Sequence, residues 1–121
     1  MSRSGLATVR GSQITVKRAT DGQALDGSAT KSWANVATGV AGLLEELTAE
    51  RAQEIWGQET RARWRTSVPW GTDVLIGDGV LVTSGNFTGR AFRVEEQLER
   101  GTSPGTRHIE LGLEETTETF A

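Results

Sequence analysis

Three glutamates in the middle of the chain, Glu45, Glu46 and Glu50, have the residue type and spacing for acid–base chemistry. Paired carboxylates perform it when a pocket pushes their pKa values apart, so that one is protonated while the other is charged. Glu45 and Glu46 are adjacent and stand beside a predicted surface loop, where water keeps both ionised. We therefore interpret these glutamates as part of a solvated face.

The other residues that could do chemistry also favour a structural interpretation. His108 is the single histidine, and no nucleophile stands in evident register with it, so neither a triad nor a His-rich metal site is indicated. The turn Gly77-Asp78-Gly79 lacks the Lys-Ser/Thr and the helix start of a phosphate loop. Cysteine is absent, which excludes disulfides and thiolate metal sites. We expect no enzyme, no cofactor and no metal.

A stripe of arginines is better suited to binding. Arg61, Arg63 and Arg65 alternate with less polar residues and would lie on one face of a predicted strand. Such charges protect a strand edge against aggregation, or they contact an acidic partner surface, which guanidinium groups bind well. Both interpretations carry equal weight, and the second places the stripe in a subunit or ring interface.

Four tryptophans are dense for a chain without tyrosine. Trp33 and Trp64 fall on predicted strands, where a buried core position is the default. Trp56 and Trp70 fall in predicted loops, where exposed large aromatics mark interfaces. We therefore predict that Trp56 and Trp70 contact another subunit.

Length and charge limit the class of protein. The 121 residues fit one domain. The net charge of −3, from 13 basic and 16 acidic side chains, differs from the basic excess of proteins that grip nucleic acid phosphates. No apolar run approaches the roughly 20 residues of a membrane helix, and the first residues lack the apolar core of a signal peptide. We expect a protein made in the cytoplasm and not bound to a membrane.

Short strands separated by turns must position these residues. Polar and apolar residues alternate in most of them, as in a half-buried strand, and glycine, proline and aspartate stand between them. Thr48 would cap a short helix at 49–54, which Gly57 would end. The predicted strands cover residues 13–18, 32–44, 58–65, 80–83, 90–97 and 107–113, with turns at 68–71, 77–79 and 84–86.

This arrangement predicts a mainly β fold, a small β-barrel or sandwich with one short helix and long flexible loops. We expect a flexible arm at 1–11, a single domain at 12–114 and a flexible acidic tail at 115–121. Residues 19–31 are predicted to form a wide or partly disordered hairpin loop. The tail is either a solubilising end or a segment that becomes ordered on a partner.

Several segments follow one another in a characteristic order: a strand at 14–18, a variable loop at 22–33, an apolar run at 36–42, a segment at 43–52, a strand at 60–65, a segment at 73–80, then Phe92-Arg93-Val94 and Ile109-Glu110-Leu111. This order resembles the head–tail joining, or head-closure (stopper), proteins of long-tailed bacteriophages. The resemblance covers roughly residues 11–115 and rests on order and spacing. The chain departs from it at 80–90, which is longer and richer in glycine, and at Ala41, where such proteins commonly carry tryptophan.

The resemblance implies a structural protein of the virion neck. Its β-barrel would form a ring, with six subunits expected and twelve as the alternative. The portal–adaptor ring would lie above it and the tail terminator or tail tube below, while double-stranded DNA passes through without sequence-specific binding. The ring would extend the portal channel, retain packaged DNA and give the tail a docking surface.

The contact residues follow from physical argument. A closed ring needs a heterologous interface, in which the arginine stripe of one subunit would face Glu45, Glu46, Glu50 or Glu54 of the next. Negative subunits would keep passing DNA mobile. We expect the segment around residue 45 to face the channel; its residues are Leu43, Leu44, Glu45, Glu46, Leu47 and Thr48.

Other functions remain open from the sequence. A tail terminator or another neck or tail ring is the nearest alternative, and an adaptor is less favoured because adaptors are usually rich in helix. A small oligonucleotide-binding barrel would need a basic groove with interleaved aromatics. Arg61–Arg65 with Trp64 hints at such a groove, but the net charge disfavours it.

Overall fold

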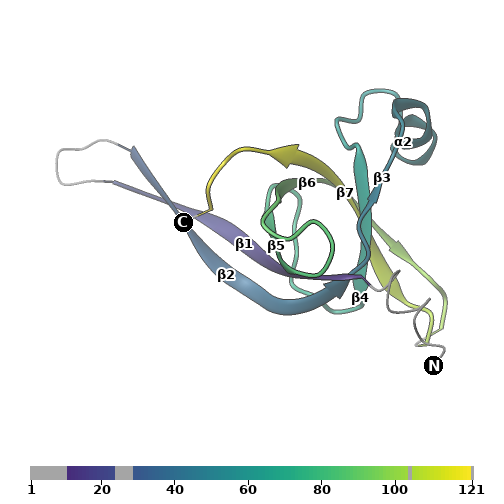
Figure 1. Ribbon diagram of the computed structural model, residues 1–121, viewed down its shortest axis with the longest axis horizontal. Coiled ribbons are helices and arrows are strands. Elements are labelled where there is room, and N and C mark those ends of the chain that lie inside the picture. The colour runs from purple at the N-terminus through teal and green to yellow at the C-terminus, as the bar shows by residue number, and fades with distance from the viewer. Residues whose placement is uncertain (1–10, 24–28, 104, 121) are drawn as a thin grey trace.

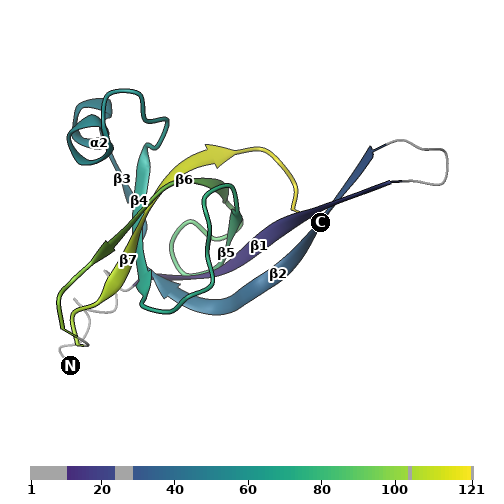
Figure 2. The same ribbon diagram turned by 180° about the vertical axis from the view of Figure 1, so that it is seen from behind.

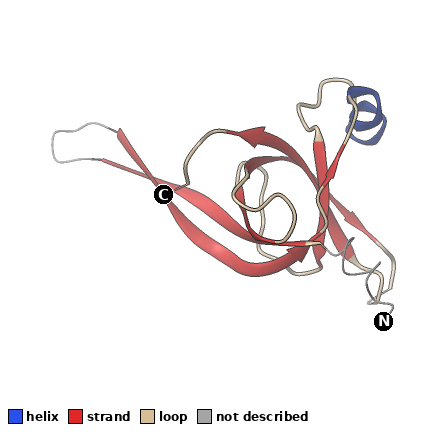
Figure 3. Cartoon of the chain, in the orientation of Figure 1, coloured by secondary structure: helices blue, strands red, loops and turns tan. Residues whose placement is uncertain are grey.

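A computed structural model of the protein describes residues 11–23, 29–103 and 105–120. Strands dominate this part of the chain, which confirms the predicted mainly β fold with a short helix (Figure 3). The elements are β1 (Ser12–Gln23), β2 (Ala29–Gly42), β3 (Glu45–Glu46), α2 (Ala49–Trp56), β4 (Trp64–Pro69), β5 (Gly79–Ser84), β6 (Ala91–Arg100) and β7 (His108–Thr116).

The strands form one antiparallel sheet in the order β2-β1-β5-β6-β7-β4-β3. The sheet is strongly curved, as Figures 1 and 2 show from opposite sides. Its curvature brings the end of β2 against β4: a Cβ on Gly42 would lie 2.8 Å from Thr66 Oγ1. Glycine at this position therefore allows the two ends of the sheet to approach each other.

The core lies on the concave side of the sheet. Alternate residues of each strand point inward, as the sequence pattern predicts. Trp64 is 5% exposed, so its predicted core position is confirmed, whereas Trp33 is only partly buried. The buried residues of the central strands are Ile14, Val16, Val80, Val82, Phe92, Val94, Ile109, Leu111 and Leu113.

Helix α2 confirms the predicted caps and extends two residues further than predicted. Thr48 Oγ1 accepts a hydrogen bond from the Arg51 amide at 3.2 Å, and Gly57 ends the helix at a φ of 105°. Ala52 is fully buried and anchors the helix to the domain. No helix in the described part of the chain is long and apolar enough to cross a membrane.

The predicted strand at 58–65 is wrong over most of its length. Inward and outward positions alternate from Thr60 onward as predicted, but β4 begins only at Trp64 and runs on to Pro69. Before Trp64 the backbone makes isolated bonds, in which Arg63 donates to the Leu113 carbonyl and its own carbonyl accepts from Leu47. The alternation of polar and apolar residues therefore correctly indicated an extended backbone. It could not show which of these residues pair with a neighbouring strand, because the partner strands are distant in the sequence.

The predicted wide loop at 19–31 is also wrong at both of its ends. Pairing of β1 with β2 continues as far as Gln23 opposite Ala29, and residues 24–28 lie outside the described residues. Glycine and aspartate weaken a strand without preventing it in a two-stranded ribbon. The expected arm at 1–11 falls outside the described residues except for Gly11, which packs closely against Gly42.

The predicted domain boundary at residue 114 is wrong. Glu115 and Thr116 belong to β7, and Phe120 is 5% exposed, so residues 115–120 pack on the domain instead of forming a free tail. Phe120 is an isolated apolar residue in an acidic segment, so no periodic pattern of apolar residues predicted its burial. Burial of its aromatic ring against a distant strand nevertheless holds the segment in place.

Candidate functional site

A two-stranded ribbon projects from the curved sheet (Figure 1). β1 pairs with β5 only from Gln13 to Lys17, so from Arg18 onward β1 pairs with β2 alone. β2 is an edge strand, and its 14 residues include one charged side chain, Lys31. Proteins usually protect such an edge with charges, proline or a covering segment. The ribbon is therefore the part of the described chain most suited to contact a partner.

The base of the ribbon is fixed by an ion-pair cluster. The Arg18 guanidinium donates to both carboxylate oxygens of Asp78, at 3.0 and 2.8 Å, and to Asp73 at 2.9 Å. These bonds raise the pKa of Arg18 further above its usual range, mainly through Asp78. The buried Asp78 carboxylate also accepts from the Leu75 amide at 2.8 Å. The cluster thus ties β1 to the loop that precedes β5.

A C-terminal strap, residues 117–120, holds the ribbon from the other side. The Phe120 ring lies 4.6 Å from the Trp33 ring, between centroids. It also lies over Gly79, where a Cβ would come within 2.8 Å of the ring. Glu118 adds ion pairs to Arg93 at 2.7 Å and to Lys31 at 4.0 Å. The strap therefore joins β2 to β5 and β6.

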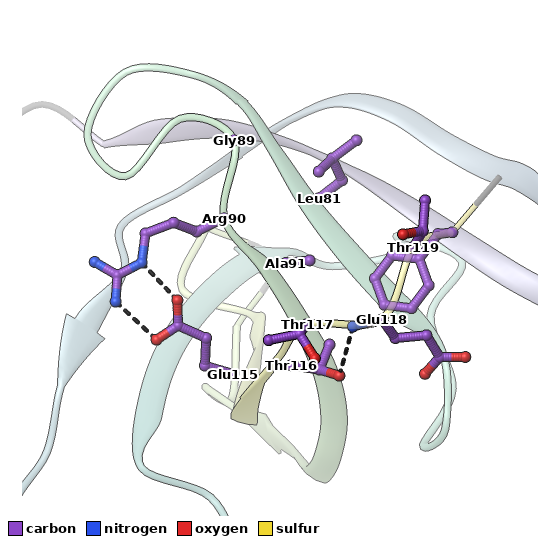
Figure 4. A pocket seen from close by; sticks show the side chains of 10 residues that line it. Leu81, Gly89, Arg90, Ala91, Glu115, Thr116, Thr117, Glu118 and Thr119 are labelled. Carbon is purple, nitrogen blue, oxygen red and sulfur yellow. Dashed lines mark hydrogen bonds and ion pairs between the residues drawn. The ribbon is translucent and has the colours of Figure 1, made fainter.

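A cavity of about 440 Å³ lies between the strap and the β5–β6 hairpin (Figure 4). Leu81 and Ala91 lie on one side of it and the strap on the other. At its rim Arg90 makes two bonds to Glu115, at 2.6 and 2.7 Å, which lower the pKa of the Glu115 carboxyl. Three threonines, four apolar residues or glycine and three charged side chains line the cavity, and the charged side chains are already joined in ion pairs.

Phe87 packs against Trp64 and Arg90 beside this rim. It has a φ of 67°, a left-handed conformation that costs a non-glycine residue about 1–3 kcal/mol. Its ring meets Trp64 edge-on at 5.1 Å, and the Arg90 guanidinium lies 5.0 Å from the Trp64 ring and 5.5 Å from the Phe87 ring. These contacts offset the strain and keep Trp64 out of water.

The arginine stripe is divided among different contacts. Arg65 pairs with Glu45 of the same chain at 2.7 Å, and Arg63 donates to the carbonyls of Thr60 and Ala62. Arg61 is exposed. Arg65 and Glu45 thus already satisfy each other within the chain. An oligonucleotide-binding groove would need an exposed aromatic side chain among the arginines. Trp64, the aromatic residue within the stripe, is buried.

The segment expected to face a channel has mixed exposure. Leu44 and Leu47 are buried, so these two side chains do not face a channel as expected, because β3 pairs with β4 and turns them into the core. Leu43 is 55% exposed. Thr48 of the predicted channel-facing segment is exposed, as are Glu45, Glu46 and Glu50 of the predicted interface.

The remaining predicted residues lie apart from one another. Trp56 is the last residue of α2 rather than part of a loop, and it is partly buried. Trp70 lies in a turn and is 45% exposed, at the opposite end of β4 from α2. His108 Nδ1 lies 2.9 Å from the Thr106 carbonyl and its Nε2 3.9 Å from Glu110. Across the described ranges no three metal-ligating groups gather.

Glu95, at a bulge in β6, gives a prediction on stability. Burial, followed by the neighbouring Glu114 charge, raises the pKa of Glu95. A carboxyl whose pKa is higher in the folded state stabilises the fold below its unfolded pKa and loses that contribution as the pH rises. Glu95→Gln should therefore raise Tm at pH 7, with the gain vanishing below about pH 4. The exposed Glu99 provides the matched control, and equal Tm values for the two variants at pH 7 would contradict the prediction.

Comparison with known proteins shows a fold relationship. No protein-family model and no curated protein matches the chain. Among solved structures, the chain is similar to the solution structure of protein SF1141 from Shigella flexneri 2a, with a TM-score of 0.69 and 14% sequence identity. The match covers 93% of this chain and 97% of that one. At this identity, the likeness concerns the fold alone.

Proposed function

We propose that this chain is a subunit of a ring in the neck of a long-tailed bacteriophage, acting as a head-closure protein. In this role it extends the portal channel, retains packaged DNA and provides a docking surface for the tail. The order of the sequence segments supports the proposal through their resemblance to such proteins.

The observation that carries the proposal is the projecting ribbon with its open β2 edge. An isolated two-stranded ribbon is marginal in water and gains stability from a partner. The ribbon and the acidic end formed by β3 and α2 are different surfaces of one subunit (Figure 2). Contact between different surfaces is heterologous, and such contacts close into rings when the rotation permits.

Gene inactivation in the phage or prophage that encodes the chain tests this function. We expect heads that fail to join tails and that lose DNA, together with free tails, in electron micrographs of the lysate. Expression of the wild-type chain in trans should restore joined particles. Normal infectious particles without the chain would contradict the proposal.

The interface makes a further prediction at residue level. Arg61 is the exposed member of the arginine stripe, so Arg61→Glu should weaken ring assembly about tenfold if the stripe faces an acidic neighbouring surface. Arg100→Glu, an exposed arginine at the β6–β7 turn away from α2 and the stripe, is the control for the same charge change. Sedimentation of the assembled ring measures the effect, and equal assembly of the two variants would argue against a role for the stripe.

A further inference from the structure

The turn that joins β6 to β7 forms a basic end of the molecule away from the acidic α2 region (Figure 1). Arg100 pairs with His108 across the hairpin, and His108 pairs with Pro69 on the next strand. This register brings Arg100, Arg107 and Trp70 to the same end of the sheet. Residues 100–108 include two arginines and no acidic residue, in a chain whose net charge is −3.

Hydrogen bonds join the described residues on the two sides of this turn. The Ser103 carbonyl accepts from the amides of Thr106 and Arg107, both at 3.0 Å. Gly101 has a φ of 89°, and a Cβ there would lie 2.3 Å from the Thr106 carbonyl oxygen. Glycine is therefore required for the two sides of the turn to meet. Arg107 follows directly from this turn, so its backbone position is fixed.

Arg107 and Trp70 form an exposed pair. The Arg107 guanidinium lies 4.6 Å from the centre of the Trp70 ring, and Trp70 is 45% exposed. Among the described residues no carboxylate forms an ion pair with Arg107. Arg100 is held only loosely, at 3.4 Å from Glu110. Arg107 and the exposed part of Trp70 can thus meet an anionic partner directly, whereas Arg100 would exchange its pair with Glu110 for that partner.

We propose that this basic end binds the sugar–phosphate backbone of nucleic acid. Arg100 and Arg107 would neutralise phosphates, and the exposed face of Trp70 would contact sugar or base. The hydroxyls of Ser103 and Thr106 lie 3.1 Å apart and bond within the turn, so they help to hold Arg107 in place. Two cations make this contact weak and independent of sequence. This nucleic acid contact would be made by the free chain and does not depend on ring assembly.

Fluorescence anisotropy of a labelled mixed-sequence DNA duplex, titrated with the full chain at low salt, tests the inference. Arg107→Ala should weaken binding roughly fivefold and reduce the slope of log K against log salt by about 0.9. Arg51→Ala removes the same charge from the exposed face of α2 and should leave both quantities unchanged. Trp70→Ala should weaken binding of a single-stranded oligonucleotide about tenfold.

Two results would overturn the inference. One is equal DNA binding by Arg107→Ala and Arg51→Ala, provided that thermal unfolding shows both variants folded. The other is displacement of the labelled DNA by poly-L-glutamate as effective as displacement by unlabelled DNA of the same total charge. That result would identify the basic end as a surface for acidic proteins. Failure of either kind leaves the neck-ring proposal untouched, since ring formation is measured separately.

Discussion

Phe120→Ala is expected to lower the free energy of unfolding by about 3 kcal/mol. The ring is buried against Trp33 and over Gly79, and removal of a buried phenyl ring costs about 3–5 kcal/mol in lost transfer energy and cavity formation. A loss at the lower end is expected because Thr117 and Thr119 are exposed, so the strap can relax around the missing ring. Urea unfolding followed by tryptophan fluorescence measures the change.

Thr119→Ala is the matched control for this prediction. Thr119 is the exposed neighbour in the same strap, so its truncation should change stability by less than about 0.5 kcal/mol. Equal stability of the two variants would mean that Phe120 does not pack on the domain. In that case the flexible acidic tail expected from composition would be the correct description.

Asp78→Asn is expected to destabilise the fold by about 2–3 kcal/mol. The side chain of Asp78 is 4% exposed and binds both the Arg18 guanidinium and the Leu75 amide. Removing one partner of a buried ion pair leaves the other charge without compensation. Arg18 is 31% exposed and retains Asp73, so water offsets part of the loss.

Asp73→Asn separates the role of burial from that of charge. Asp73 contacts the same guanidinium at a similar distance, but its side chain is 57% exposed. An exposed ion pair contributes about 0–1 kcal/mol, so this variant should remain close to wild type in thermal unfolding. A loss as large as that of Asp78→Asn would show that net charge, rather than the buried bonds, holds the base of the ribbon.

Local signals in the sequence predicted most of the elements. Alternation located β5, β6 and β7 because their inward residues meet one shared core, and Thr48 with Gly57 marked both ends of α2. The predictions were wrong where contacts with residues distant in the sequence determine the secondary structure. Residues before Trp64 alternate without a ladder, and β1 and β2 pair beyond Lys17 despite glycine and aspartate. Pairing register is a tertiary property that a single strand does not encode.

The candidate site was less predictable for the same reason. The Arg65–Glu45 pair joins residues 20 positions apart, and the contact between Trp33 and Phe120 spans most of the chain. No spacing rule connects such residues. Trp70 was predicted to lie in a turn, and it does, with 45% of its surface exposed, while its contact with another subunit stays a prediction. Arg107 had no sequence signal beyond its charge, because only the fold brings it over the Trp70 ring.

Mass in solution, measured by light scattering with and without a portal–adaptor complex, tests the neck-ring proposal most directly. We expect the free chain to be smaller than a ring, and the complex to gain a whole number of subunits that matches its symmetry, six or twelve. Template-dependent assembly of this kind would support a head-closure ring. A chain whose mass is unaffected by the complex, and which adds no mass to it, would contradict the proposal.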